Sequence, residues 1–422
     1  MAKETLAKDR VNFINYTTTT LDNGLKIIHH SHQQSALAGI SLLISAGSKN
    51  DFPGKSGLAH LFEHLMYGGT ELVKDYDHWL QRAGGDGNAF TSQDVTCYYA
   101  TIPVQNLALY LRLEADRLQH LKLTTPRLRT ECQVVIEEFN ETVLDEPFGD
   151  ALHAILGHMF PADHPYSSPT IGRNVASLKA IHKDDLERFY DDYYHVGNAF
   201  LAIVSPLADG QVFKMCEDIF GAIRPHPHRD TLPTPLSRVP LSATMVKKAN
   251  APQHEISLVF PMRGRLSKQY LHSGALDLLL AHGDSSYLYK TLVRDLRLAL
   301  DVDVYSTGHY ENGLFFVEVS LAQDISIIKA QESIIQVLQN YLSRGCRPED
   351  LAKIFNNCEC RNIYLEMDVI KTCNYLAYAL WLGRPEIIQE ELNMHRDLRA
   401  DDLWASAHQL LDPQHCFTLI YD

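Results

Sequence analysis

The sequence predicts an α+β protein made of two homologous domains, each a mainly antiparallel sheet with helices packed on one face. The apolar run 40–44 returns as 256–260, an offset of 216 residues. The run 184–186 returns as 401–403, an offset of 217. In both copies, apolar residues follow 14 and 17 positions after the leucine of this run. Each copy alternates short strand-like runs with segments of helical periodicity, so one structural unit is present twice.

The length of 422 residues also favours two domains, because one hydrophobic core rarely grows beyond about 250–300 residues. We expect the first domain over 1–223 and the second over 249–422. The Pro-rich stretch between them, 224–248, is typical of a semi-rigid linker. Inside the domains, apolar periodicity predicts helices at 104–121 and 325–342.

The composition argues against several kinds of partner and location. The net charge of −14 disfavours nucleic acid and anionic membranes. No apolar run approaches the roughly 20 residues of a membrane-spanning helix, and residues 1–8 lack the apolar core of a signal peptide. The eight cysteines form no C-x-x-C pair, which is typical of free thiols in a reducing compartment. We expect a cytoplasmic protein, or a periplasmic or organellar one if a targeting segment was removed.

Residues 60–64 read H-x-x-E-H. On a helix, His60 and His64 project from one face about a turn apart, which suits two of the three ligands of a catalytic zinc. Glu63 lies on the neighbouring stripe and can act on water without competing for the metal. The alternative is an ordinary amphipathic helix with two surface histidines. Against it, the motif borders an apolar stripe at helical spacing, formed by Leu58, Leu61, Phe62 and Leu65.

A third ligand is expected on the helix predicted at 125–146. Glu131 and Glu138 lie seven residues apart, so both carboxylates point the same way. Glu138 is the candidate ligand, and Glu131 would orient a ligand or a bound water. Glu137 points elsewhere, and Glu141 is a weaker candidate. The alternative is a solvated acidic helix face.

A second histidine cluster occupies 29–32. It offers several imidazoles that could bind a metal. The surface of a hairpin is the more ordinary interpretation of this segment, and we expect it here.

The H-x-x-E-H motif followed 74 residues later by the second glutamate of an E-x6-E pair resembles the pitrilysin–insulysin–mitochondrial processing peptidase family, the inverzincin zinc metallopeptidases. The N-terminal half resembles that family closely and the C-terminal half only in outline. The resemblance implies the catalytic subunit of a half-length, two-chain metallopeptidase that binds one Zn²⁺ per chain. Further segments resemble the family in sequence: 22–25, 57–70, 87–92, 164–166 and 171–172.

The resemblance also implies how substrate binds. Asn88, Ala89, Phe90 and Thr91 would form an edge strand to which an extended peptide adds as a further strand, a mode that favours unfolded or short peptides. The alternative is a plain turn at 84–87 that Asn88 caps.

The second copy has lost the ligands of the first. With the offset of 217, the motif's two histidines and its glutamate correspond to Asp277, Ala281 and Leu280. In single-chain and homodimeric relatives, the non-catalytic copy carries an Arg with a Tyr seven residues later, which hold the substrate carbonyl. Here Arg294 is present but Asp301 takes the tyrosine position, and a carboxylate would repel a developing oxyanion.

We therefore expect a heterodimer with a sister chain that lacks H-x-x-E-H and supplies the Arg/Tyr pair. A homodimer that uses Arg294 alone is the alternative. The expected activity is a zinc metalloendopeptidase. A dedicated maturation protease for one precursor peptide and a non-proteolytic scaffold subunit remain open.

Overall fold

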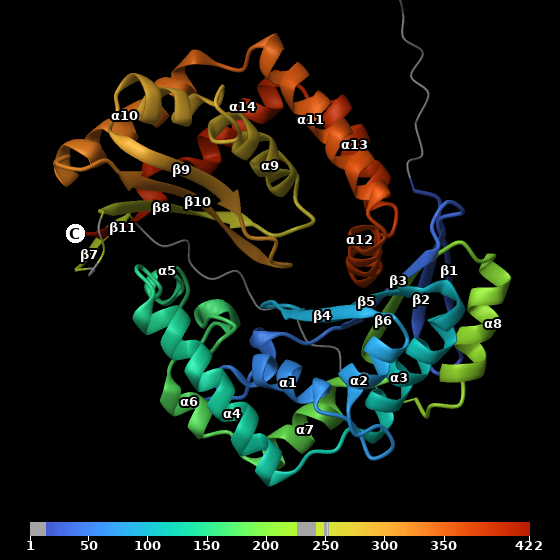
Figure 1. Ribbon diagram of the computed structural model, residues 1–422. Helices are drawn as coiled ribbons and strands as arrows, with labels where there is room; N and C mark the ends of the chain where they lie inside the picture. Colours follow the sequence, from blue (N-terminus) through green and yellow to red (C-terminus); the bar gives the residue numbers. More distant parts are fainter. Residues whose placement is uncertain (1–13, 226–241, 249–250, 252) are drawn as a thin grey trace, which may run out of the picture.

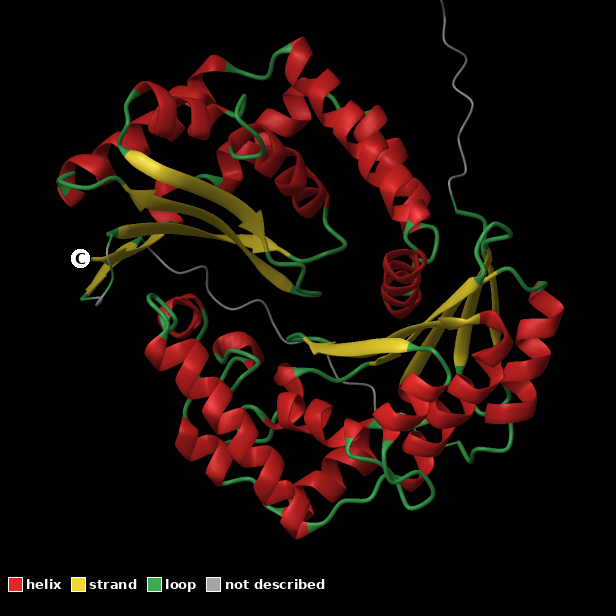
Figure 2. Cartoon of the chain, viewed as in Figure 1, coloured by secondary structure: helices red, strands yellow, loops and turns green. Residues whose placement is uncertain are grey.

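The computed structural model describes residues 14–225, 242–248, 251 and 253–422, and shows two sheets flanked by helices (Figures 1 and 2). The strands are β1 (Thr17–Thr20), β2 (Lys26–Ser31), β3 (Leu37–Ile44), β4 (Asp86–Thr91), β5 (Thr96–Pro103), β6 (Ala199–Ser205), β7 (Ala243–Lys247), β8 (Glu255–Arg263), β9 (Ala299–Ser306), β10 (Asn312–Leu321) and β11 (Phe417–Tyr421).

Helices make up most of the remaining described chain. The α-helices are α1 (Leu58–Tyr67), α2 (Tyr76–Arg82), α3 (Leu107–His120), α4 (Thr125–Phe139), α5 (Ala151–Met159), α6 (Val175–Lys179), α7 (Lys183–Tyr193), α8 (Asp209–Phe220), α9 (Lys268–Leu280), α10 (Ile327–Arg344), α11 (Pro348–Met367), α12 (Val369–Trp381), α13 (Ile387–Arg396) and α14 (Ala400–Leu410). Shorter helical segments are η1 (Ser48–Asn50), η2 (Val104–Asn106), η3 (Asn140–Asp145), η4 (Pro165–Ser167), η5 (Val196–Asn198), η6 (Tyr289–Asp295) and η7 (Pro413–His415).

The two sheets repeat one topology. The first has the order β1-β2-β6-β3-β5-β4 and the second the order β7-β11-β8-β10-β9. Neighbouring strands are antiparallel except for the parallel pairs β2/β6 and β7/β11, so β2-β6-β3-β5-β4 corresponds strand by strand to the second sheet. The predicted α+β fold with two homologous, mainly antiparallel units is confirmed.

One boundary differs from the expectation. The strand β7 lies inside the range 224–248 that the sequence suggested as a linker, and it pairs with β11. The second sheet therefore begins before residue 249. The Pro-rich core of that range, 226–241, lies outside the described residues.

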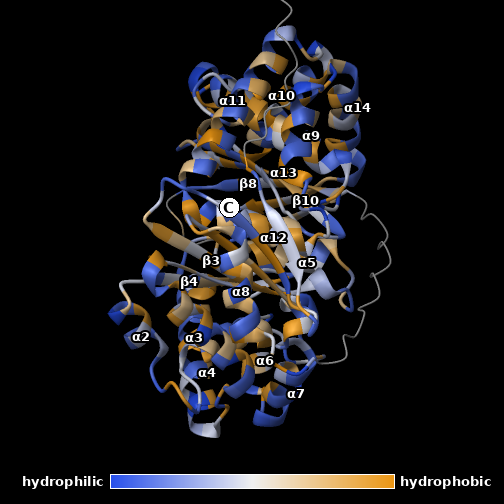
Figure 3. Cartoon of the chain, turned by 90° about the vertical axis from the view of Figure 1, so that its right-hand side faces the viewer, coloured by the Kyte–Doolittle hydropathy of each residue, from blue (hydrophilic) through white to orange (hydrophobic). Residues whose placement is uncertain are grey.

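Each sheet is covered on both faces. Helices of its own half pack on one face, as the sequence predicts. The other face is covered by a helix from the other half: α12 packs on β3 and β6 of the first sheet, and α5 packs on β11 of the second. Figure 3 shows hydrophobic residues gathered around α12 and the central strands. Strands such as β6 are buried along their whole length because both faces are covered.

The segment 29–32 does belong to a hairpin of β1 and β2, but His29 and His30 are buried and His32 is half-buried, so the expected surface position was wrong for the first two. His29 and His30 lie on β2, an inner strand, and are 0% and 7% exposed. His29 Nδ1 lies 2.6 Å from a carboxylate oxygen of Asp209 on α8. His30 Nδ1 lies 2.6 Å from the backbone oxygen of Asn15. Each of these two side chains therefore has a hydrogen-bond partner other than a metal, and the cluster forms no metal-binding group in the described chain.

Two global features bear on the surroundings of the protein. All eight cysteines are free thiols, as their spacing predicts. Among the described residues, no helix combines the length and the apolar character needed to cross a bilayer.

The contact between α12 and the first sheet is close at Gly39 of β3. A Cβ there would lie 2.9 Å from the backbone oxygen of Val369. We expect Gly39→Ala to lower the free energy of unfolding by about 1–3 kcal/mol, because α12 must shift off the sheet. Urea denaturation followed by circular dichroism measures this.

The matched control is Gly157→Ala on α5, where an added Cβ meets nothing within 4 Å. It should be neutral, or stabilising by up to about 1 kcal/mol, because alanine favours a helix. Unchanged stability of Gly39→Ala would contradict the close packing of α12.

Candidate metal centre

The helix α1 carries the H-x-x-E-H residues with its apolar side buried. Leu58, Leu61 and Leu65 are 0% exposed, whereas the side chains of His60 and His64 are 14% and 25% exposed. The histidines therefore stand at the edge of the core, on the helix that the apolar spacing predicted.

The start of α1 is fixed by Asp51. Its carboxylate accepts hydrogen bonds from the backbone N–H groups of Gly57 and Ala59, at 2.7 and 2.8 Å. Gly57 has φ +96°, and an added Cβ would lie 2.9 Å from the backbone oxygen of Ile171. Glycine is needed here for both reasons, and an acid at a helix N-terminus is electrostatically favourable.

The end of α1 is held by Arg127 of α4. Its guanidinium donates to the backbone oxygen of Gly69 at 3.1 Å and to that of Leu65. A Cβ at Gly68 would fall within the space of this guanidinium. Sequence reasoning found neither Asp51 nor Arg127, because their partners lie far along the chain and no spacing links them. Arg127 ties α4 to α1, and this contact sets where the glutamates of α4 lie.

Three candidate ligands converge where α1 meets α4. Glu138 Oε1 lies 3.8 Å from His60 Nε2, and Glu138 Oε2 lies 3.5 Å from His64 Nε2. One donor atom from each of the three residues lies within 4.8 Å of the others. Two imidazole nitrogens and a carboxylate are a donor set that suits zinc with a position left open for water or substrate. The predicted ligands are therefore close enough to share one ion.

The ionisable groups of this cluster shift one another's pKa values. The hydrogen bond to Glu138 raises the pKa of His64, and the same bond lowers the pKa of Glu138. Burial lowers the pKa of His60, which favours the neutral imidazole that binds metals. An ionised carboxylate between two imidazoles is a natural place for a divalent cation.

Glu63 lies beside the cluster in contact with β4. The hydroxyl of Thr91 donates a hydrogen bond to Glu63 Oε2 at 2.5 Å. Burial raises the pKa of the Glu63 carboxyl, and the bond from Thr91 partly opposes this. A carboxylate with a raised pKa is a stronger base at neutral pH.

The strand β4 forms the edge of the first sheet, since β5 is its neighbour on one side only. Ala89 and Thr91 are half-buried on the side of α1, whereas Asn88 and Phe90 are exposed and alternate with them. The predicted segment is thus a strand at a sheet edge, beside the candidate metal centre. Its pairing with a peptide stays a prediction.

Two other predicted residues are less closely placed. Glu131 is half-buried on α4 and its charge contributes to the raised pKa of His64, but in the described chain it makes no hydrogen bond to His60 or His64.

Arg294 is exposed on η6. The neighbouring Leu292 packs into the second sheet's own helical layer, on the face opposite α5. Arg294 therefore lies across the second sheet from the first half and its metal centre.

Two family models match the chain: "Insulinase (Peptidase family M16)" over residues 26–170 and "Peptidase M16 inactive domain" over 180–358. Over 337 residues the chain is 26% identical to a protein of Helicobacter pylori named zinc protease PqqE, covering 78% of this chain and 75% of that protein. A solved structure of a protease from Helicobacter pylori aligns with a TM-score of 0.91 at 24% identity, covering 97% of this chain and all of that one. Pitrilysin aligns with a TM-score of 0.78 at 18% identity, covering all of this chain and 46% of that chain.

We expect Glu138→Ala to abolish stoichiometric zinc binding, because it removes the only carboxylate of the candidate ligand set. Metal content after dialysis against a weak chelator measures this. The control is Glu137→Ala, whose side chain is exposed on the same helix and should leave zinc bound. Full zinc content in Glu138→Ala would exclude Glu138 as a ligand.

Proposed function

The chain belongs to the peptidase M16 family of zinc proteases, and on that premise we propose that it is the catalytic subunit of a zinc metalloendopeptidase acting on unfolded or short peptides. The observation that carries the proposal is the convergence of His60, His64 and Glu138, with Glu63 beside them. The eight free cysteines favour a reducing compartment, so we propose the cytoplasm as its location.

One Zn²⁺ per chain would be held by His60, His64 and Glu138. When bound, the metal would supply Lewis acidity, which lowers the pKa of water and polarises a carbonyl group. Glu131, near the same cluster, would orient His64 or a water through its charge.

Glu63 would act as the general base and then the general acid. Burial raises the pKa of its carboxyl, and a shift in this direction favours proton transfer near neutral pH. It would accept the proton of the attacking water and pass that proton to the leaving amine. The hydroxyl of Thr91 holds one carboxylate oxygen, which leaves the other free to face the reacting water.

The edge of β4 would bind the substrate as an added strand. Backbone hydrogen bonds along Asn88 to Thr91 would fix the extended peptide beside α1, and the exposed Asn88 and Phe90 would contact its side chains. Because a strand pairs through its backbone, folded proteins would be poor substrates and flexible peptides good ones.

We expect Glu63→Gln to reduce kcat/KM by about 10²–10⁴-fold while zinc stays bound, because the amide keeps the shape but accepts no proton. Hydrolysis of a quenched fluorescent peptide and metal analysis give both readouts. Glu71→Gln, at an exposed position, is the control. Loss of zinc from Glu63→Gln would show that Glu63 has another role.

A sister chain would complete the site. Arg294 lies across the second sheet from its own metal centre, and the exposed Asp301 stands where the family's tyrosine would donate. We therefore propose a heterodimer with a homologous chain that lacks H-x-x-E-H and carries both the Arg and the Tyr. A homodimer in which Arg294 serves the neighbouring copy is the alternative.

The purified chain should bind zinc but hydrolyse peptides at least about 10²-fold more slowly than its mixture with the sister chain, because an oxyanion donor is missing. Full turnover by the chain alone would defeat the heterodimer. Loss of that turnover in Arg294→Ala would then support the homodimer.

A further inference from the structure

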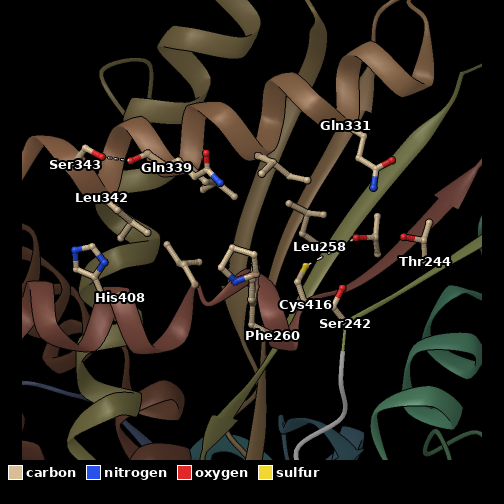
Figure 4. A pocket seen from close by; sticks show the side chains of 15 residues that line it. Ser242, Thr244, Leu258, Phe260, Gln331, Gln339, Leu342, Ser343, His408 and Cys416 are labelled. Atoms are coloured by element: carbon tan, nitrogen blue, oxygen red, sulfur yellow. Dashed lines mark hydrogen bonds between the residues drawn. The ribbon is translucent and has the colours of Figure 1, made fainter.

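Two cavities in the second half differ in their chemistry. The first, of about 510 Å³, lies between α10, α14 and the strands β7, β8 and β11 (Figure 4), and no Asp, Glu, Lys or Arg is among the described residues that line it. The second, of about 500 Å³, lies between α9, α11, α12, α13 and the end of β9. Four charged residues line this second cavity, which we call the α9 cavity: Arg265, Asp277, Arg361 and Glu391. Charged groups in a cavity orient a ligand and select it by its charges.

The α9 cavity lies at the place in the second half that the candidate metal centre takes in the first. The helix α9 is the counterpart of α1, and β9 is the counterpart of the edge strand β4. The helix α4 follows β5 and α3, α11 follows β10 and α10, and α11 contacts α9 as α4 contacts α1 (Figure 1). Asp277 takes the position of His60. Arg361 stands as far from the start of α11 as Glu138 stands from the start of α4. Side chains of opposite charge therefore replace the candidate ligands here.

Asp277 lines the α9 cavity from α9 and is half-buried. Within the described chain, its carboxylate accepts no hydrogen bond and forms no ion pair. Burial raises the pKa of this carboxyl to about 6, and the charge of Arg361 opposes the shift. A carboxylate that is removed from water without a hydrogen-bond donor is costly. The ammonium group of a ligand would supply the donors that this carboxylate lacks.

Arg361 lines the same cavity from α11 and is exposed. Its charge reaches Asp277, but the two side chains form no ion pair within the described chain. The other two charged residues of the cavity are already paired. Arg265 donates a hydrogen bond to Glu391, whose second carboxylate oxygen accepts from the hydroxyl of Tyr375 at 2.6 Å. The cavity therefore offers a ligand one carboxylate and one guanidinium, on two helices that contact each other.

Two uncharged acceptors also line the cavity. His395 Nδ1 lies 2.6 Å from the backbone oxygen of Glu391, so Nδ1 carries the proton and Nε2 is an acceptor. Burial lowers the pKa of His395, which favours this neutral form. Asn357 Oδ1 is buried and has no hydrogen-bond partner within the described chain. The cavity also has an apolar wall, which includes Leu271, Leu278, Leu365, Ile388 and Leu392.

We propose that the α9 cavity binds a small zwitterion of the amino acid class, with an ammonium group, a carboxylate group and an apolar side chain. Asp277 would accept from the ammonium group, and Arg361 would donate to the carboxylate. Asn357 and His395 would accept the remaining ammonium N–H groups, and the apolar wall would enclose the side chain. A free amino acid and a dipeptide share this chemistry, and a cavity of about 500 Å³ admits either. The proposal does not require the chain to be a peptidase.

Isothermal titration calorimetry of the purified full chain with L-leucine and with L-leucyl-L-leucine tests the proposal. At least one of them should bind saturably with a Kd below about 1 mM, and the tighter one shows whether the site takes an amino acid or a peptide. The N-acetyl derivative of that ligand lacks the ammonium group, and its amide lacks the carboxylate. Each derivative should bind at least about tenfold more weakly, because one charged hydrogen bond is lost.

Two conservative variants assign the charges to their residues. Asp277→Asn and Arg361→Gln should each weaken binding of the parent ligand at least about tenfold. The penalty for N-acetylation should then vanish in Asp277→Asn, and the penalty for amidation should vanish in Arg361→Gln, because each partner has already been removed. The matched controls are Asp284→Asn and Arg129→Gln, at exposed positions outside the cavity, and both should leave the Kd unchanged. Circular dichroism checks that every variant is folded.

Absence of saturable binding by both ligands would overturn the proposal, as would binding that Asp277→Asn and Arg361→Gln leave unchanged. The candidate metal centre is the other place where such a ligand could bind. Binding that is lost in Glu138→Ala and kept in Asp277→Asn would place the ligand there, and it would also overturn the proposal.

Discussion

The packing of α4 against α1 is the contact on which the metal centre depends. Two histidines one turn apart can present two ligands on any exposed helix, but the third ligand must come from a second rigid element. Arg127 donates to the backbone oxygens of Leu65 in α1 and Gly69 just after it, and Asp51 accepts from N–H groups at the start of the helix. These two contacts fix α1 at both ends, and Glu138, three turns along α4, falls beside His60 and His64.

The two halves stabilise each other through an exchange of helices. Each sheet is apolar on both faces, so the helices of its own half can cover only one of them. The helices α5 and α12 cover the remaining faces across the halves. Because the exchange buries apolar surface on both sheets, neither half presents a complete core on its own, and the second half is needed even though it carries no metal ligands.

One structural unit used twice has diverged at the ligand positions. In α9, the counterpart of α1, the ligand positions hold Asp277, Leu280 and Ala281, so the candidate ligand cluster occurs once among the residues that the structure describes. Comparison of the repeats therefore separates the residues that maintain the fold from those that serve a site.

The sequence by itself determined the features that depend on local spacing. The offset of 217 predicted the repeated unit, the apolar stripe predicted α1, and the seven-residue interval placed Glu131 and Glu138 on one face of α4. Such patterns follow from helical and strand periodicity, which acts over a few residues. The spacing from Arg294 also placed Asp301 at the position where the related family carries a tyrosine.

Only the tertiary structure decided what depends on contacts between distant segments. Three contacts join residues that no periodicity relates. They are the packing of α8 over His29, the hydrogen bond from Thr91 to Glu63 and the hydrogen bonds from Arg127 at the end of α1. The strand β7 is likewise a strand because β11 pairs with it, and its sequence neighbours gave the opposite indication. Whether Glu138 reaches both histidines also depends on the tertiary structure. Sequence spacing places Glu131 and Glu138 on one face of α4, but it does not place α1 beside that face.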